Sequence, residues 1–188
     1  MAFQLQTDRL LLRDAGPADE SALISYFAEP EAQPQILKTQ KGPEWVQNCI
    51  RAASHIPPLE QRSHFWMAVE VKATRELCGV CSLIYAEPGS TYAVLGWHLA
   101  QSHSGKGYAT ESARELLRLA FEQKGVRLVR ADCFADNPKA QRVFSKLGMK
   151  QQQLSRFRRW WMSTNYGEDK PIVRYTINAD VWCQQSGV

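Results

Sequence analysis

The sequence predicts a single α+β domain over residues 1–188, built on one central mixed sheet. Three observations support this fold class. Apolar and polar residues alternate along several short stretches, which is the pattern of strands with one buried face. Longer stretches repeat apolar residues every three or four positions, as amphipathic helices do. Glycine and proline separate these stretches, and the chain contains no internal repeat or low-complexity segment.

The first third of the chain predicts one strand followed by two helices. Residues 7–13 alternate in polarity and form the first predicted strand. Pro17 is followed by acidic residues and then by an apolar helical pattern, so a helix should begin there. Pro30 and Pro34 should end that helix, and a second helix should begin at Pro43.

Three consecutive strands are predicted in the middle of the chain, at residues 65–71, 77–85 and 92–99. Each has an alternating or apolar pattern. Short polar turns separate them, and strands joined by short turns must run antiparallel. We therefore expect an antiparallel meander.

Helices and strands follow each other in the second half of the chain. A helix should run from about Gly107 to Lys124 and end at Gly125. The next helix should have Asn137 as its N-cap and Pro138 as its first residue. The remaining elements are three predicted strands, at residues 126–134, 149–161 and 172–178.

The composition excludes several classes of protein. Hydrophobic residues make up 44% and charged residues 22%, as in ordinary globular proteins. The formal net charge is +4 without any block of like charges, so we expect no direct nucleic-acid partner. No apolar run approaches the ~18 residues of a membrane helix, and the N-terminus has no secretory pattern. We expect a cytoplasmic protein with no membrane partner.

The five cysteines do not form a recognisable disulfide or metal set. Cys78 and Cys81 have the C-x-x-C spacing, but they lie inside a predicted strand and no second pair completes a zinc site. Two interpretations are buried reduced thiols and a metal or redox pair. We favour the thiols and expect no metal.

The most informative stretch is the glycine turn between the strand at 92–99 and the helix that follows it. Gly105 and Gly107 bracket Lys106 there. A glycine turn before a helix N-terminus directs several N–H groups at one point and binds anions. The spacing matches neither a nucleotide P-loop nor a Rossmann fingerprint. The turn therefore predicts a site for a phosphate or pyrophosphate.

Several pieces of the chain, taken in order, resemble one known superfamily. They are Thr7–Arg13, Leu95–Leu99, Gly105–Glu111, Asn137 and Val143–Met149. Their order and content resemble the GNAT superfamily of acyl-CoA-dependent N-acyltransferases, and most closely its ribosomal-protein N-terminal acetyltransferase branch. The resemblance covers about residues 5–180.

This resemblance implies a GNAT fold, with a mostly antiparallel sheet of about seven strands flanked by about four helices. It implies transfer of an acetyl group from acetyl-CoA to a primary amine by direct attack, without a metal. The cofactor-binding residues that it implies are Trp97, Leu99, His103, Ser104, Gly105, Lys106, Gly107, Tyr108, Ala109, Thr110, Asn137, Phe144 and Lys146.

Simpler roles remain open for some of these residues. Asn137 is also a good helix cap without any ligand, and Lys106 can be a solvated loop charge. Glu111, in the first helical turn, fits a dipole-complementing or hydrogen-bonding role better than that of a base. Ala140 and Phe144 occupy the positions where many relatives carry a proton donor, so no ordinary general acid is expected there.

The acceptor side is less clearly marked. His98 is the candidate catalytic base because its ordinary pKa is near neutrality, although a strand histidine can be purely structural. Arg156 and Trp160 are candidate acceptor-binding residues in a basic, aromatic segment. The alternative for this segment is a strand with its arginines in solvent and its tryptophans in the core.

The acceptor itself is expected to be a protein or peptide N-terminal α-amine, or a small amine. A site without a strong base favours amines of low pKa: at pH 7 about a tenth of an α-amine is neutral, and far less of a lysine. The rival interpretations are a catalytically silent acyl-CoA-binding module and an RNA-binding protein. The oligomeric state is expected to be a monomer or homodimer.

Overall fold

The computed structural model describes residues 3–30, 32, 40, 42–53, 57–166 and 170–186. Within them, eight strands form one sheet in the order β1-β2-β3-β4-β5-β6-β8-β7. The strands are β1 (Gln4–Gln6), β2 (Leu10–Asp14), β3 (His64–Val71), β4 (Leu77–Tyr85), β5 (Tyr92–Leu99), β6 (Leu128–Phe134), β7 (Lys150–Gln151) and β8 (Ile172–Asn178). The predicted meander is confirmed, because β3, β4 and β5 are sequential antiparallel neighbours.

The described residues contain six α-helices. They are α1 (Glu20–Ala28), α2 (Pro43–Ala53), α3 (Tyr108–Arg118), α4 (Pro138–Lys146), α5 (Arg156–Tyr166) and α6 (Ala179–Ser186). The first four confirm the predicted helices. A π-helical turn, Leu119–Gln123, extends α3, and Gly125 follows with a φ of 64°. Pro34, predicted to help end α1, lies outside the described residues.

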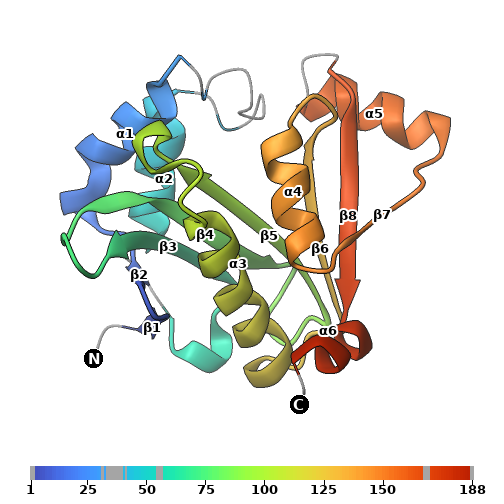
Figure 1. Ribbon diagram of the computed structural model, residues 1–188, viewed down its shortest axis with the longest axis horizontal. Coiled ribbons are helices and arrows are strands. Elements are labelled where there is room, and N and C mark those ends of the chain that lie inside the picture. Colours follow the sequence, from blue (N-terminus) through green and yellow to red (C-terminus); the bar gives the residue numbers. More distant parts are fainter. Residues whose placement is uncertain are drawn as a thin grey trace.

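The sheet consists of two halves that meet along a short parallel seam. β5 and β6 pair only through Tyr92–Val94 and Leu128–Arg130, whereas every other pair of neighbouring strands is antiparallel. Beyond the seam, β5 stays with β4 and β6 stays with β8. Figure 1 shows that β5 and β6 lie together at one end of the sheet and diverge toward the other.

Helices cover both faces of this sheet (Figure 1). On one face, α3, α4 and α6 bury a core that includes Leu116, Phe144 and Trp182. On the other face, α1 and α2 cover the strands before the seam. The helix α5 covers the strands after it, where Met162 packs against Phe134 and Ile172. Because these helices sit on different halves of the sheet, the second face is left open between them.

The predicted strand at residues 149–161 is wrong over most of its length. Only Lys150–Gln151 is a strand, paired to β8, and α5 starts at Arg156. Ser155 caps this helix, since its hydroxyl accepts a hydrogen bond from the Arg158 amide at 3.3 Å. The burial of Met162 against two strands then fixes the helix in place. The short strands β1 and β7 and the helix α6 raise the counts above the predicted seven strands and four helices.

Cys78 and Cys81 are buried free thiols on β4. Both belong to the core that α3, α4 and α6 cover. Residues three apart on a regular strand would face opposite sides, but the register of β4 shifts opposite Val69 and Glu70 and brings both thiols to one face. Burial raises the pKa of Cys78 to about 12 and also raises the pKa of Cys81. Among the described residues, no group of three or more histidine, cysteine, aspartate or glutamate side chains could hold a metal ion. None of the described helices is long and apolar enough for a membrane span.

Candidate functional site

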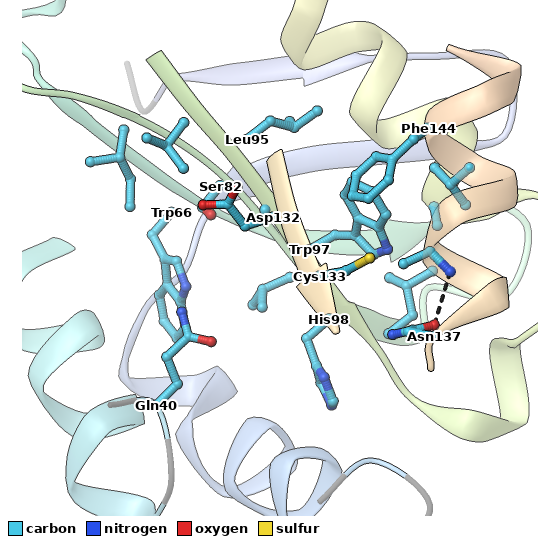
Figure 2. A pocket seen from close by; sticks show the side chains of 18 of the residues that line it. Gln40, Trp66, Ser82, Leu95, Trp97, His98, Asp132, Cys133, Asn137 and Phe144 are labelled. Carbon is cyan, nitrogen blue, oxygen red and sulfur yellow. Dashed lines mark hydrogen bonds between the residues drawn. The ribbon is translucent and has the colours of Figure 1, made fainter. Parts of the chain in front are cut away.

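A cleft of about 1220 Å³ opens where β5 and β6 diverge. Consecutive residues of β5 line it from opposite faces, because side chains alternate along a strand. Figure 2 shows Trp97 beside Phe144, Asn137 further along the same helix, and His98 pointing the other way. The cleft therefore borders α3 and α4 on one face of the sheet, and α1, α2 and α5 on the other.

The diverging edge of β5 presents backbone groups to this cleft. The Ala100 amide donates to the Cys78 carbonyl on β4 at 3.0 Å. Because backbone groups of successive strand residues face opposite edges, His98 also faces β4, whereas Trp97 and Leu99 face the opening. The β6 pairing ends at Val94, so no strand of the described sheet takes up the Trp97 and Leu99 N–H groups.

The glycine turn forms the second wall of the cleft. Gly105 and Gly107 have φ angles of +80° and +84°, which are left-handed conformations that glycine adopts without strain. The Tyr108, Ala109 and Thr110 amides have no preceding helical carbonyl to bond, and the first helical bond runs from the Glu111 amide to the Gly107 carbonyl. These free amides and the positive end of the α3 dipole form an anion site.

Nearly all predicted residues of the turn line the cleft: His103, Ser104, Gly105, Gly107, Tyr108, Ala109 and Thr110. Lys106 is the exception. Its carbonyl accepts a hydrogen bond from Arg9 Nη1 at 3.0 Å, and the residue lies outside the cleft lining. The contribution of the Lys106 charge to an anion site therefore stays a prediction.

Glu111 anchors the turn to the N-terminal strand. Its carboxylate accepts hydrogen bonds from the Thr7 hydroxyl, the Arg9 amide and Arg9 Nε. Burial raises the pKa of Glu111, but these hydrogen bonds and the Arg9 charge outweigh burial and lower the pKa overall. A carboxylate with three donors already bound is poorly suited to act as a base, which agrees with the hydrogen-bonding role expected for it.

The helix α4 adds polar groups on the same side of the cleft. Asn137 Oδ1 accepts from the Ala140 amide at 3.0 Å, so the predicted cap is confirmed (Figure 2). Lys146 lines the cleft as expected. Lys139 and Arg142 also line it, although neither was predicted from the sequence. Their spacing with Lys146, i, i+3 and i+7, places all three on one helix face, and this pattern could have predicted a basic helix face from the sequence.

Comparison with known proteins now identifies the family. A family model described as an acetyltransferase (GNAT) domain matches residues 9–150, three quarters of the chain. The chain belongs to the GNAT acetyltransferase family. The matched range runs from the start of the anchored N-terminal strand through the glycine turn and Asn137 to β7.

Individual relatives agree with this GNAT assignment. The uncharacterised N-acetyltransferase p20 of Bacillus licheniformis is 24% identical over 153 residues, 81% of this chain and 85% of its own. The structure of RimL, a ribosomal L7/L12 α-N-protein acetyltransferase, in complex with coenzyme A has a TM-score of 0.73 at 20% identity and covers 95% of this chain and 99% of its own. A spermidine N-acetyltransferase SpeG chimera from Vibrio cholerae and hSSAT gives 0.71 at 18%, with 94% and 99% covered. The predicted GNAT fold is confirmed.

No ordinary general acid occupies the two expected positions of this GNAT chain. Ala140 has no titratable group, and Phe144 is only 1% exposed, with its ring 5.3 Å from Trp97 and 4.7 Å from Tyr175. Cys133 also lines the cleft, but burial raises the pKa of its thiol to about 12. Such a thiol is a weaker acid than a free cysteine thiol, whose pKa is about 8.5. It is therefore a poor proton donor and stays uncharged near neutral pH.

His98 lines the cleft on the second face of the sheet. Its ring stacks on Phe27 at 4.1 Å, and Nε2 lies 3.1 Å from the Tyr26 carbonyl. A carbonyl can only accept, so Nε2 carries the proton and Nδ1 keeps the lone pair. Burial lowers the pKa of His98, and the imidazole is therefore neutral at pH 7. No described residue forms a hydrogen bond with Nδ1, so the neutral ring can accept a proton there.

The segment with the proposed acceptor residues is helical, which changes which side chains face the cleft. Arg156 and Trp160, the latter 61% exposed, lie outside the cleft lining. Arg158, Trp161 and Met162 line it instead. Residues at i, i+3 and i+4 share a helix face, whereas a strand would have separated them. The alternative strand with a tryptophan core is also wrong.

Proposed function

We propose that this chain is an N-acetyltransferase that moves the acetyl group of acetyl-CoA to a primary amine by direct attack. One observation carries the proposal: the open edge of β5 and the N-terminus of α3 border the same cleft. A carrier with a diphosphate, an amide-rich arm and a reactive thioester needs an anion site and free strand amides together. Membership of the GNAT family supports this function.

The residues present fit such a carrier. The amides of Tyr108, Ala109 and Thr110 are placed to bind its diphosphate, and the cations of α4 would add attraction to its charge. Acetyl-CoA supplies an acetyl thioester, whose carbon bonds to the amine nitrogen while the C–S electron pair leaves with sulfur. The Trp97 and Leu99 N–H groups can stabilise the charge that develops on the carbonyl oxygen. Solvent can protonate the departing thiolate, because its conjugate thiol has a pKa of about 8.5.

The acceptor that we propose first is a protein or peptide N-terminal α-amine, with a small amine second. Two structural neighbours act on these two kinds of amine, according to their names: RimL on the N-terminus of a ribosomal protein and SpeG on spermidine. The side chain proposed as the base is His98, whose pKa is lowered by burial, and a weak base favours amines that lose their own proton readily. An α-amine does so near pH 8.

The function is tested by incubating the purified protein with acetyl-CoA and a panel of amines while free thiol is followed. Thiol release should depend on the amine, and mass spectrometry should detect the acetylated product. Tight coenzyme A binding without release across peptides and small amines would instead support the silent acyl-CoA-binding module. Absence of any coenzyme A affinity would contradict both.

His98 is the proposed proton acceptor, and His98→Gln tests it. The glutamine amide can still donate to the Tyr26 carbonyl, but it cannot accept a proton at neutral pH. We expect kcat at pH 7 to fall about 100-fold while coenzyme A affinity is retained. Since burial lowers the pKa of His98, the wild-type activity that depends on it should persist at pH 7 and be lost only below the ordinary histidine pKa of about 6.5. A kcat of His98→Gln equal to that of the wild type between pH 6 and 8 would leave His98 with a structural role.

A further inference from the structure

The second face of the cleft is unusually cationic. Among the described residues, the whole cleft lining contains seven arginine and lysine side chains but only two carboxylates. Three of the cations are on α4, on the side assigned above to the carrier. The other four lie at or beyond the β5–β6 seam and on the β3 side, where the amine would enter: Arg62, Arg130, Arg158 and Arg174. Binding of the carrier does not explain these four charges.

Two of these four cations are already neutralised. Arg62 is paired with Asp14. Arg174 Nε and Nη2 bond both oxygens of the Asp132 carboxylate, at 2.8 and 2.9 Å. Such two-point pairs are strong, and here both oxygens of the carboxylate already accept a hydrogen bond from one guanidinium. Asp132 is therefore largely committed to Arg174.

Arg130 lies beside this pair without an equivalent partner. Its Nε is buried and has no hydrogen-bond partner among the described residues. The nearest carboxylate oxygen, of Asp132, is 3.8 Å away, beyond hydrogen-bond distance. Its guanidinium carbon lies 5.4 Å from the centre of the Tyr92 ring. A buried donor without an acceptor is costly. The Arg130 side chain as a whole is 30% exposed, so the accessible part of its guanidinium can meet an anionic ligand in the cleft.

Arg158 reaches the same region from the first turn of α5 and lines the cleft. No carboxylate in the described part of the chain forms an ion pair with it. Burial raises the pKa of Tyr92, while the charges of Arg130, Arg174 and Arg158 each lower it. Arg130, Arg158 and Arg174 all line this cleft, and Asp132 is the one carboxylate of the described residues that pairs with any of them.

We propose that Arg130 and Arg158 bind a carboxylate carried by the amine acceptor. This inference rests on the proposed function. Arg130 pairs with Val94, and Trp97 lies three residues further along β5, about 10 Å in an extended strand. The carboxylate should therefore lie within about 10 Å of the amine. A polyamine acceptor is disfavoured, because its positive charges would meet these two arginines, which among the described residues share only the distant Asp132 carboxylate at 3.8 Å from Arg130.

The test compares peptides that differ in one charge. Tetrapeptide amides with aspartate, asparagine or lysine at the second position share the same α-amine and nearly the same size. We expect kcat/KM for the aspartate peptide to exceed that for the asparagine peptide by at least about tenfold, with the lysine peptide poorest. The asparagine peptide with a free C-terminal carboxylate, compared with its amide, separates a side-chain carboxylate from a terminal one.

Arg130→Met and Arg158→Met should each reduce this preference, and the double variant should abolish it. Arg159→Met is the matched control, because Arg159 lies on the same helix but is exposed outside the cleft. It should keep the wild-type preference. Coenzyme A affinity should remain unchanged in all variants, which shows that they are folded.

Calorimetric binding of the same peptides to the coenzyme A-loaded protein makes the test independent of turnover. Preferential, arginine-dependent binding of a carboxylate-bearing peptide without acetylation would support the anion site and contradict the proposed function. Equal affinity for the three peptides, or a preference that survives the double substitution, would overturn the anion site even if amines are acetylated.

Discussion

The double variant Gly105→Val/Gly107→Val is expected to bind coenzyme A at least about 100-fold more weakly than the wild type. Both residues have φ angles near +80°, where valine is strained. At Gly107, a new Cβ would also meet Arg9 Nη2 at 3.3 Å. Relief of this strain must turn the peptide units of the loop, and the amides at the start of α3 would then no longer converge on one anion. Titration calorimetry with coenzyme A measures the loss.

Gly89→Val provides the control for backbone strain. Gly89 has a φ of +80° in the turn between β4 and β5, with no atom within 4 Å of a Cβ there, and lies outside the cleft lining. Its substitution should lower stability by about 1–2 kcal/mol and leave coenzyme A affinity unchanged. Equal affinities for the double variant and the wild type would mean that the glycine turn is not the anion site.

Gly79→Ala is expected to destabilise the protein by about 3 kcal/mol or to prevent folding. Gly79 has a φ of +145°, and a Cβ there would lie 2.2 Å from the His98 carbonyl oxygen and 2.7 Å from Leu99 Cα. These atoms belong to the backbone of β5, so the clash can be relieved only if the strand moves. Urea unfolding followed by tryptophan fluorescence measures the change in the free energy of unfolding.

The same substitution should also weaken coenzyme A binding in whatever fraction folds, because β5 would shift where its Trp97 and Leu99 amides face the cleft. Gly16→Ala is the matched control. Gly16 has an extended backbone, and nothing lies within 4 Å of a Cβ there, so stability should change by less than about 1 kcal/mol. Wild-type stability of Gly79→Ala would show that the two strands can separate without cost.

Local patterns predicted most of the fold, and the failures have a physical cause. Alternation placed β3, β4, β5 and β8 correctly, because each buries at least one face of a sheet. The segment after Gly148 was assigned to one strand although only Lys150–Gln151 pairs there. The helix α5 depends on the Ser155 cap and on the burial of Met162 against strands that precede and follow it in the sequence. The basic and aromatic residues of this segment gave no clear period.

The candidate site divides in the same way. The glycine turn and Asn137 were found from sequence because their roles depend on backbone conformation and on helix termini, which are local properties. Arg130 was missed because nothing in its neighbourhood in the sequence marks it. Arg130 pairs with Val94, and its neighbour Asp132 forms an ion pair with Arg174; both contacts join residues tens of positions apart in the sequence.

The sequence by itself determined the fold class, the helix and strand order around the glycine turn, and the GNAT resemblance. The individual signals are encoded within short segments by side-chain period, capping and glycine conformation, and the order of these segments along the chain carries the fold class and the resemblance. The tertiary structure alone decided that β5 and β6 separate after three residue pairs, and which strand amides are thereby left open. It also decided which arginines share the cleft without a close ion pair to any described residue. Such features depend on which distant groups meet and satisfy one another, and only the packed chain specifies that.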